Sequence, residues 1–123
     1  MALQENQTID RVYLSANLVD ISTASSAFVV SPVRGRIVKA WSVIYGAITS
    51  ADAVWTMEIN GTAITGVSVT VANSGSAAGD VDSGTPTSET TNRVNPGDTI
   101  EFVSDGASST AIAATFVVAI DVF

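Results

Sequence analysis

The sequence predicts an all-β protein, an antiparallel two-sheet sandwich of jelly-roll type with seven to eight strands. Val, Ile and Thr dominate the composition, and these β-branched side chains fit a pleated sheet better than a helix because their χ1 angles are restricted. Short apolar runs are separated by turns that contain glycine or proline. The 123 residues are enough for one domain, which we place at 11–123 behind a polar N-terminal arm at 1–10.

A β-hairpin is predicted for 53–71, where Asn60-Gly61 separates two apolar runs. Both turn residues tolerate the positive φ that a type I′ turn requires. A two-residue turn pairs Trp55 with Gly66 and fixes which side chains share the buried face. Beyond Gly66 the apolar positions move by one residue, which predicts a β-bulge near Thr65-Gly66. The side chains expected on the buried face are Trp55, Met57, Ile59 and Ile64.

Turn signals and apolar runs place the remaining strands. Ser31-Pro32 ends a short strand, because proline cannot donate a hydrogen bond to a sheet. Asn95-Pro96-Gly97-Asp98 fits a type II turn, which needs glycine at its third position, and Asp105-Gly106 forms the next turn. Residues 11–21 alternate weakly and predict one or two short strands, although a poor helix also fits. The other expected strands are 27–30, 35–45, 88–94, 99–104 and 111–123. In 99–104 we expect Ile100 and Phe102 to face inward, and alternation in 111–123 places on one face the side chains of Ile112, Ala114, Phe116, Val118, Ile120 and Val122.

The two longest expected strands, 35–45 and 111–123, are half apolar on both faces. Such strands are typically covered on both sides, by their own core and by something else. Between them, 72–95 is small and polar and is unusually long for a loop. Its part at 72–91 either docks on another protein or is a mobile excursion. Strict alternation in 35–45 gives one face made of Ile37, Lys39, Trp41, Val43 and Tyr45.

The composition excludes several kinds of chemistry. The chain has no cysteine and no histidine, so it lacks disulfides, thiolate metal sites, cysteine nucleophiles and the commonest general base. A net charge of −7 disfavours nucleic acid and anionic membrane surfaces as partners. The start of the chain is not a signal peptide, and its longest apolar run is shorter than the ~20 residues of a spanning helix. We therefore expect a soluble protein made in the cytoplasm with no encoded route for export.

Asp80 and Asp82, followed by Ser83-Gly84, form a fragment of a calcium loop. A complete loop needs further oxygen ligands, and Glu89 is badly spaced to supply the bidentate one. A solvated acidic loop therefore explains the motif better than a metal site, and we expect no cofactor. A hydrolase with these two carboxylates is disfavoured, because an exposed loop gives no apolar pocket to separate their pKa values.

Arg34, Arg36 and Lys39 supply three of the five positive charges within a short stretch. They form either a basic patch for an acidic partner or ordinary solubilising charge at a strand edge. Strict alternation places Arg36 and Lys39 on opposite faces of their strand. Trp41 and Tyr45 on the same strand are either core residues or an exposed anchor for a partner or a sugar.

Four stretches of the chain resemble small head-decoration (cement) proteins of tailed bacteriophages. They are FVVSPVRGRIVKAWSVIYGAIT at 28–49, SADAVWTMEINGTAIT at 50–65, GSAAGDVDSGTPT at 75–87 and NPGDTIEFVSDG at 95–106. The resemblance implies a β-sandwich that trimerises on the outer surface of a capsid, at or near its three-fold positions. It also implies the major capsid protein and further copies of this chain as partners, with no enzymatic activity.

The residues alone are compatible with this function, because half-apolar outer faces suit a protein that self-associates and binds a shell. The interface residues that we predict are Arg34, Arg36, Lys39, Trp41, Tyr45, Asp80 and Asp82. Two alternatives stay open. One is a carbohydrate- or receptor-binding module of a fibre or adhesin, which needs an exposed aromatic platform with polar neighbours. The other is a hydrolase, which needs two convergent carboxylates in a pocket.

Overall fold

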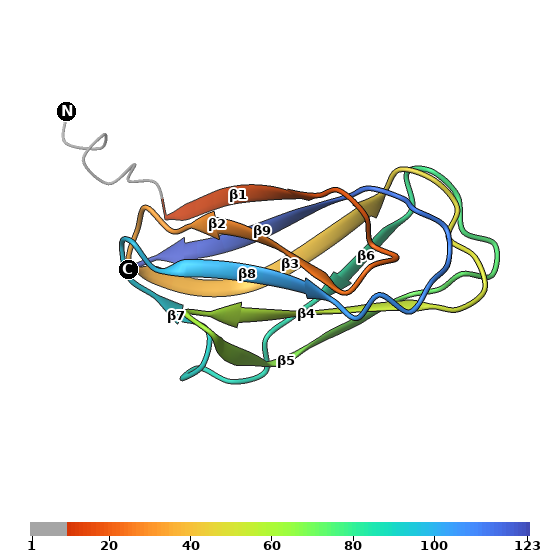
Figure 1. Ribbon diagram of the computed structural model, residues 1–123. Coiled ribbons are helices and arrows are strands. Elements are labelled where there is room, and N and C mark those ends of the chain that lie inside the picture. Colours follow the sequence, from red (N-terminus) through yellow and green to blue (C-terminus); the bar gives the residue numbers. More distant parts are fainter. Residues whose placement is uncertain (1–9) are drawn as a thin grey trace, which may run out of the picture.

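The computed structural model describes residues 10–123 and confirms the all-β prediction (Figure 1). The described chain contains nine strands and no helix, so no helix in this part could span a membrane. The predicted arm at 1–10 lies, apart from Asp10, outside the described residues. The strands are β1 (Arg11–Leu18), β2 (Ser25–Val30), β3 (Gly35–Ile44), β4 (Ala53–Ile59), β5 (Thr62–Val71), β6 (Val81–Gly84), β7 (Arg93–Val94), β8 (Thr99–Ser104) and β9 (Ala114–Val122).

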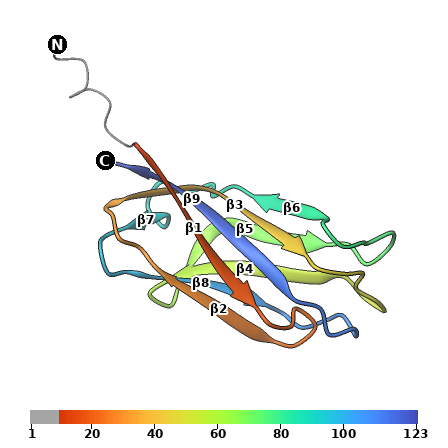
Figure 2. The same cartoon turned by 90° about the horizontal axis from the view of Figure 1, so that it is seen from above.

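The strands form two antiparallel sheets that lie one over the other (Figure 2). The larger sheet has the order β1-β9-β3-β6, and β7 also pairs with β3. The smaller sheet has the order β2-β8-β4-β5. The start of β1 and the end of β9 lie at the same end of the sandwich, together with β7 (Figure 1). We call this the C-terminal end, and the loops β1–β2, β3–β4, β5–β6 and β8–β9 lie at the other end.

The predicted hairpin is present as β4 and β5. Asn60 and Gly61 both have positive φ, and Ile59 pairs with Thr62 as expected. Gly66 has a φ of 91°, which confirms the predicted irregularity at this glycine. One pairing was wrong: Trp55 lies opposite Val69, not Gly66, because the register shifts between Thr56 and Glu58 before Trp55 is reached. The four side chains expected on the inner face are all buried.

The predicted faces of β3 are wrong beyond Ile37. A bulge between Ile37 and Lys39 inverts the alternation, so Ile37 is buried while Trp41 points outward. Arg36 and Lys39 consequently lie on the same outer face, not on opposite ones. Asn92 holds the bulge: its carbonyl accepts the Ile37 N–H (2.8 Å), and its side-chain amide donates to the Ile37 carbonyl (2.9 Å).

The polar segment 72–95 is more ordered than its composition suggested. It contains β6, which pairs with β3 from Ala40 to Val43, so Asp82 lies on an edge strand and not in a solvated loop. The short strand expected at 88–94 exists only as β7. Periodicity could not identify β6, because a four-residue strand with one large apolar side chain has no readable pattern.

The core lies between the sheets and has three aromatic rings at its centre. The rings of Phe102 and Phe116 are stacked with centroids 4.8 Å apart, and Trp55 meets the Phe116 ring edge-on at 5.1 Å. The Trp55 indole N–H donates to the Ser42 hydroxyl (3.0 Å), which satisfies the one polar atom of this buried side chain. As predicted, Ile100 and Phe102 of β8 point inward with Phe116, Val118 and Ile120 of β9.

The β1–β2 turn supplies a first testable prediction. The Asp20 carboxylate accepts hydrogen bonds from the Ser22 N–H (2.9 Å), the Ser22 hydroxyl (2.6 Å) and the Thr23 hydroxyl (2.8 Å). These bonds favour the ionised form and lower the pKa of Asp20 from 3.8 to about 2. A carboxyl whose pKa is lower in the folded state stabilises the protein above its unfolded pKa, and this contribution is lost as the pH falls through the folded pKa.

We therefore expect Asp20→Asn to lower the melting temperature by a few degrees near neutral pH. The difference from the unsubstituted protein should close between about pH 4 and about pH 2, where the native carboxylate becomes protonated. Melting temperatures of both proteins, measured across this range by circular dichroism, test the prediction. A difference that stays constant with pH would contradict it.

Candidate functional site

On the outer face of the larger sheet, the side chains change from charged to apolar along the strands, and the strand register gives their order. Nearest the C-terminal end, Arg11 pairs with Asp121, and Asp121 pairs with Arg36. Three further cross-strand rows follow toward the opposite end. These rows are Tyr13–Ala119–Lys39, Ser15–Val117–Trp41–Ser83 and Asn17–Thr115–Val43–Val81. The face therefore changes from charged to apolar over a few residues.

The middle of this face is an apolar groove of about 350 Å³. Tyr13 and Val81 are 59% and 61% exposed, although large apolar groups gain free energy from leaving water. We call the following side chains the apolar patch: Tyr13, Trp41, Val43, Val81 and Val117. The sequence predicted that Trp41 and Val43 share a face, and both side chains line this groove. The Lys39 ammonium lies 5.4 Å from the centre of the Trp41 ring.

Polar groups border the apolar patch on the side away from the charged row. The Tyr45 hydroxyl and the Thr115 hydroxyl lie 2.8 Å apart, and Thr115 also bonds to the Asn17 side-chain carbonyl (3.0 Å). Tyr45 is exposed, so its ring is part of the surface and not of the core. The outer face thus combines exposed aromatic rings with hydroxyl and amide groups.

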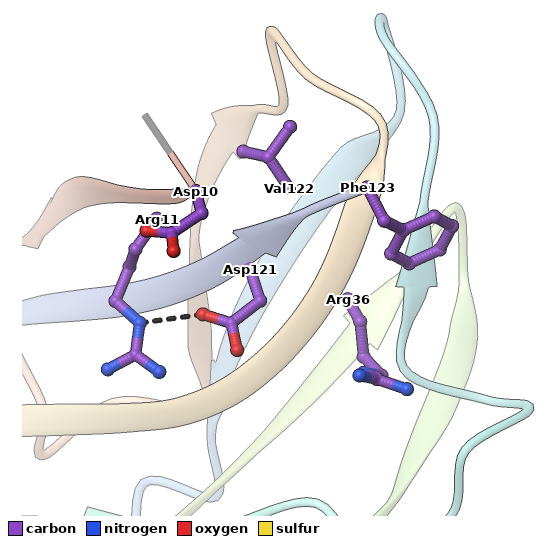
Figure 3. Close-up of a pocket in the computed structure, with 6 residues that line it drawn as sticks. All are labelled: Asp10, Arg11, Arg36, Asp121, Val122 and Phe123. Carbon is purple, nitrogen blue, oxygen red and sulfur yellow. Dashed lines mark hydrogen bonds and ion pairs between the residues drawn. The ribbon is translucent and has the colours of Figure 1, made fainter. Parts of the chain in front are cut away.

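The charged row opens into a cleft of about 550 Å³ at the C-terminal end (Figure 3). The Arg11 Nε atom lies 2.6 Å from the Asp121 carboxylate, and this hydrogen bond lowers the pKa of Asp121. Asp10 also lines the cleft. A general acid needs a raised pKa, whereas Asp121 is held in its ionised form, so Asp121 is not suited to be the acid of a hydrolytic site.

Three arginines surround the ring of Phe123 beside this cleft. The guanidinium carbons of Arg34, Arg36 and Arg93 lie 5.3, 6.0 and 5.4 Å from the ring centroid. Arg36 also forms an ion pair with Glu89, while Arg34 and Arg93 have no carboxylate partner among residues 10–123. We call Phe123 and these three arginines the arginine end. Phe123 is 50% exposed, so an approaching partner meets cations and an aromatic edge together.

Asp80 and Asp82 lie away from these groups. They line a small cleft of about 230 Å³ with Val71, between β6 and the end of β5. Partial burial raises the pKa of Asp82, and the nearby Asp80 carboxylate adds to the effect. Asp80 accepts the Ala77 N–H (2.8 Å). Within 10–123, no three carboxylates gather as ligands for a metal ion.

The predicted interface residues therefore fall into separate regions. Arg36, Lys39 and Trp41 share the outer face, with Tyr45 at its border, and Arg34 belongs to the arginine end. Asp80 and Asp82 border a different cleft. The interpretation from sequence did not single out Tyr13, Val81, Arg93 and Phe123. Alternation in β1 could have indicated Tyr13, but Arg93 reaches Phe123 only because β7 and β9 both pair with β3.

Comparisons with known proteins identify the fold. No family model matches the sequence, and no curated protein matches it significantly. A chain in the capsid of Ralstonia phage GP4 is 13% identical, with a TM-score of 0.54 over 94% of this chain and 86% of its own length. A chain of the cyanophage Pam1 capsid is also 13% identical, with a TM-score of 0.50 and coverages of 94% and 89%.

Two carbohydrate-related structures share the fold as well. CsCBM6-3 from Clostridium stercorarium, solved in complex with cellobiose, is 10% identical with a TM-score of 0.51 over 94% of this chain and 85% of its own. The catalytic unit of a GH87 alpha-1,3-glucanase from Streptomyces thermodiastaticus is 14% identical with a TM-score of 0.50 over 92% of this chain. This chain spans only 26% of that unit. These neighbours establish a β-sandwich, a fold that hosts many functions.

Proposed function

We propose that this protein is a non-enzymatic structural virion protein, a homotrimer that decorates and stabilises the outer surface of a phage capsid by binding the major capsid protein. The apolar patch carries the proposal. Five apolar side chains form one continuous surface on a protein with a net charge of −7, and such surfaces typically mark protein interfaces. The phage capsid chains among the structural neighbours support a virion role.

The architecture also suits this role. The strand orders β1-β9-β3-β6 and β2-β8-β4-β5 support the jelly-roll winding that the sequence predicts. A shell offers many equivalent sites, so a trimer whose subunits each bind weakly gains avidity. In the cleft at the C-terminal end, the ion pair with Arg11 lowers the pKa of Asp121, so this carboxyl is poorly suited to act as a general acid, which supports a binding function over hydrolysis.

A triple substitution of the apolar patch tests the proposal. Val43→Thr, Val81→Thr and Val117→Thr keep the β-branched shape and the strand propensity but place hydroxyls in the contact. Three hydroxyls buried without partners should weaken binding to purified empty heads about 100-fold, at roughly 1 kcal/mol each. Co-sedimentation of protein with heads at graded concentrations measures the effect.

The matched control carries Val19→Thr and Val54→Thr, which lie outside the patch and should leave binding unchanged. Retention of full binding by the triple variant, with the native circular dichroism spectrum, would contradict the assignment of the patch. If the unsubstituted protein does not bind the heads of the phage to which it is proposed to belong, the proposed function itself is contradicted.

A carbohydrate-binding module is the second candidate, and one feature of the outer face favours it. Tyr45 hydrogen-bonds to Thr115, which also bonds to Asn17, and the adjoining groove is lined by Tyr13 and Trp41. Such a mixture of rings and polar groups suits a sugar. The cellobiose-bound structural neighbour shares the fold. Glycan-array binding that is lost on Trp41→Ala, by a protein that does not bind heads, would favour this function.

A further inference from the structure

The charges of this molecule are segregated to an unusual degree. All five basic residues lie on the larger sheet or beside it, and four of them gather at the C-terminal end. Nine carboxylates form no ion pair with a basic side chain among residues 10–123. They are Asp10, Asp20, Asp52, Glu58, Asp80, Asp82, Asp98, Glu101 and Asp105. A second copy of this chain therefore presents acidic surfaces to the arginine end of the first.

Most of these carboxylates already have a structural role in their own loops. Asp20 accepts the Ser22 N–H, Asp52 accepts the Asn73 N–H, and Asp105 accepts the Val54 N–H. Such carboxylates stabilise turns and are poorly placed to reorient toward a partner. Glu58 and Glu101 are different, because they belong to strands and accept no backbone N–H within the described chain, although the Glu101 carboxylate accepts the Ser26 hydroxyl.

Glu58 and Glu101 are direct cross-strand partners on the outer face of the smaller sheet. Like charges in this arrangement destabilise a sheet unless a cation approaches. Phe28 pairs with Glu101 on the other side and is 60% exposed, and Val30 of the same strand is exposed as well. We call Phe28, Glu58 and Glu101 the acidic face. The acidic face is complementary to the arginine end. It has an exposed ring beside two negative charges, whereas the arginine end has an exposed ring among positive charges.

We infer that the arginine end of one copy docks on the acidic face of a second copy, and that this contact builds the homotrimer on which the proposed function rests. Arg34 and Arg93 would pair with Glu58 and Glu101, while the rings of Phe123 and Phe28 leave water together. The two surfaces are different parts of the chain, so the contact is heterologous and repeats around a ring. The apolar patch lies on the opposite sheet and stays free for the shell.

Charge reversal on each side tests the inference in solution, without capsids. One variant carries Arg34→Glu and Arg93→Glu, and a second carries Glu58→Arg and Glu101→Arg. A third variant combines all four substitutions and has the same net charge as the unsubstituted protein. Light scattering coupled to size exclusion should give three times 12.6 kDa for the unsubstituted and the combined proteins, and 12.6 kDa for the two one-sided variants.

Recovery of the trimer by the combined variant is the decisive result, because loss of folding or a change in overall charge cannot produce it. A monomeric unsubstituted protein, one-sided variants that stay trimeric, or a folded combined variant that stays monomeric would each overturn the inference. Binding to heads is tested separately, with the substitutions in the apolar patch. A protein that binds heads as a trimer without this contact therefore fails the inference and keeps the proposed function, whereas a protein that fails to bind heads loses the proposed function.

Discussion

Phe116→Ala is expected to lower the free energy of unfolding by about 3–5 kcal/mol, a large fraction of the 5–15 kcal/mol typical of a domain. Phe116 is completely buried, and its ring contacts both Phe102 and Trp55. The core consists largely of short aliphatic side chains fixed in two sheets. These side chains cannot move into the space that the ring leaves, so the loss includes a cavity term as well as lost burial.

Urea denaturation followed by tryptophan fluorescence measures this effect, because Trp55 itself lies against the removed ring. Phe116→Leu, which keeps more of the side-chain volume, should cost less than half as much. Val19→Ala, at a highly exposed position, should change stability by less than about 0.5 kcal/mol. A Phe116→Ala protein as stable as Val19→Ala would show that the aromatic cluster does not hold the sheets together.

The elements that the sequence predicted well have strict alternation and turns with special backbone requirements. β8 and β9 alternate inward and outward as expected, because each lies between two neighbouring strands and buries one face. The hairpin at Asn60-Gly61 was equally readable, since a type I′ turn requires residues that tolerate positive φ. In these segments local sequence and tertiary packing demand the same conformation.

The errors arose where a contact distant in sequence decides the local structure. Asn92 is far from Ile37 along the chain, yet its two hydrogen bonds hold the bulge that turns Trp41 outward. No pattern within 35–45 contains that information. β6 is a strand because β3 offers it a free edge, and its own sequence gives little indication of this.

The candidate surfaces follow the same rule. Trp41 and Lys39 were recognised from their residue types, but their common face depends on the bulge. The arginine end needs Arg34, Arg93 and Phe123, which come from three separated segments and meet through the pairing of β7 and β9 with β3. Residue type indicates which side chains can bind a partner, and topology decides which of them act together.

Gly66→Ala should also destabilise the protein strongly, by about 2–4 kcal/mol, from backbone strain and overpacking together. Gly66 has a φ of 91°, which a residue with a Cβ rarely adopts. An added Cβ would lie 2.8 Å from the Thr87 backbone nitrogen, too close for an ordinary contact. That nitrogen donates to the Thr65 carbonyl (3.0 Å), so the substitution would also break the bond that ties the 85–92 loop to the bulge of β5.

Gly75→Ala separates the two causes, because Gly75 also has a positive φ but has nothing within 4 Å of an added Cβ. It should therefore show only the strain, about 1 kcal/mol. Denaturation midpoints of both variants give the comparison, and hydrogen exchange of the Thr87 amide reports directly on the bond to Thr65. If both glycines cost the same and the Thr87 amide stays protected, then Gly66 is required for its φ alone, and the loop does not depend on close approach to the bulge.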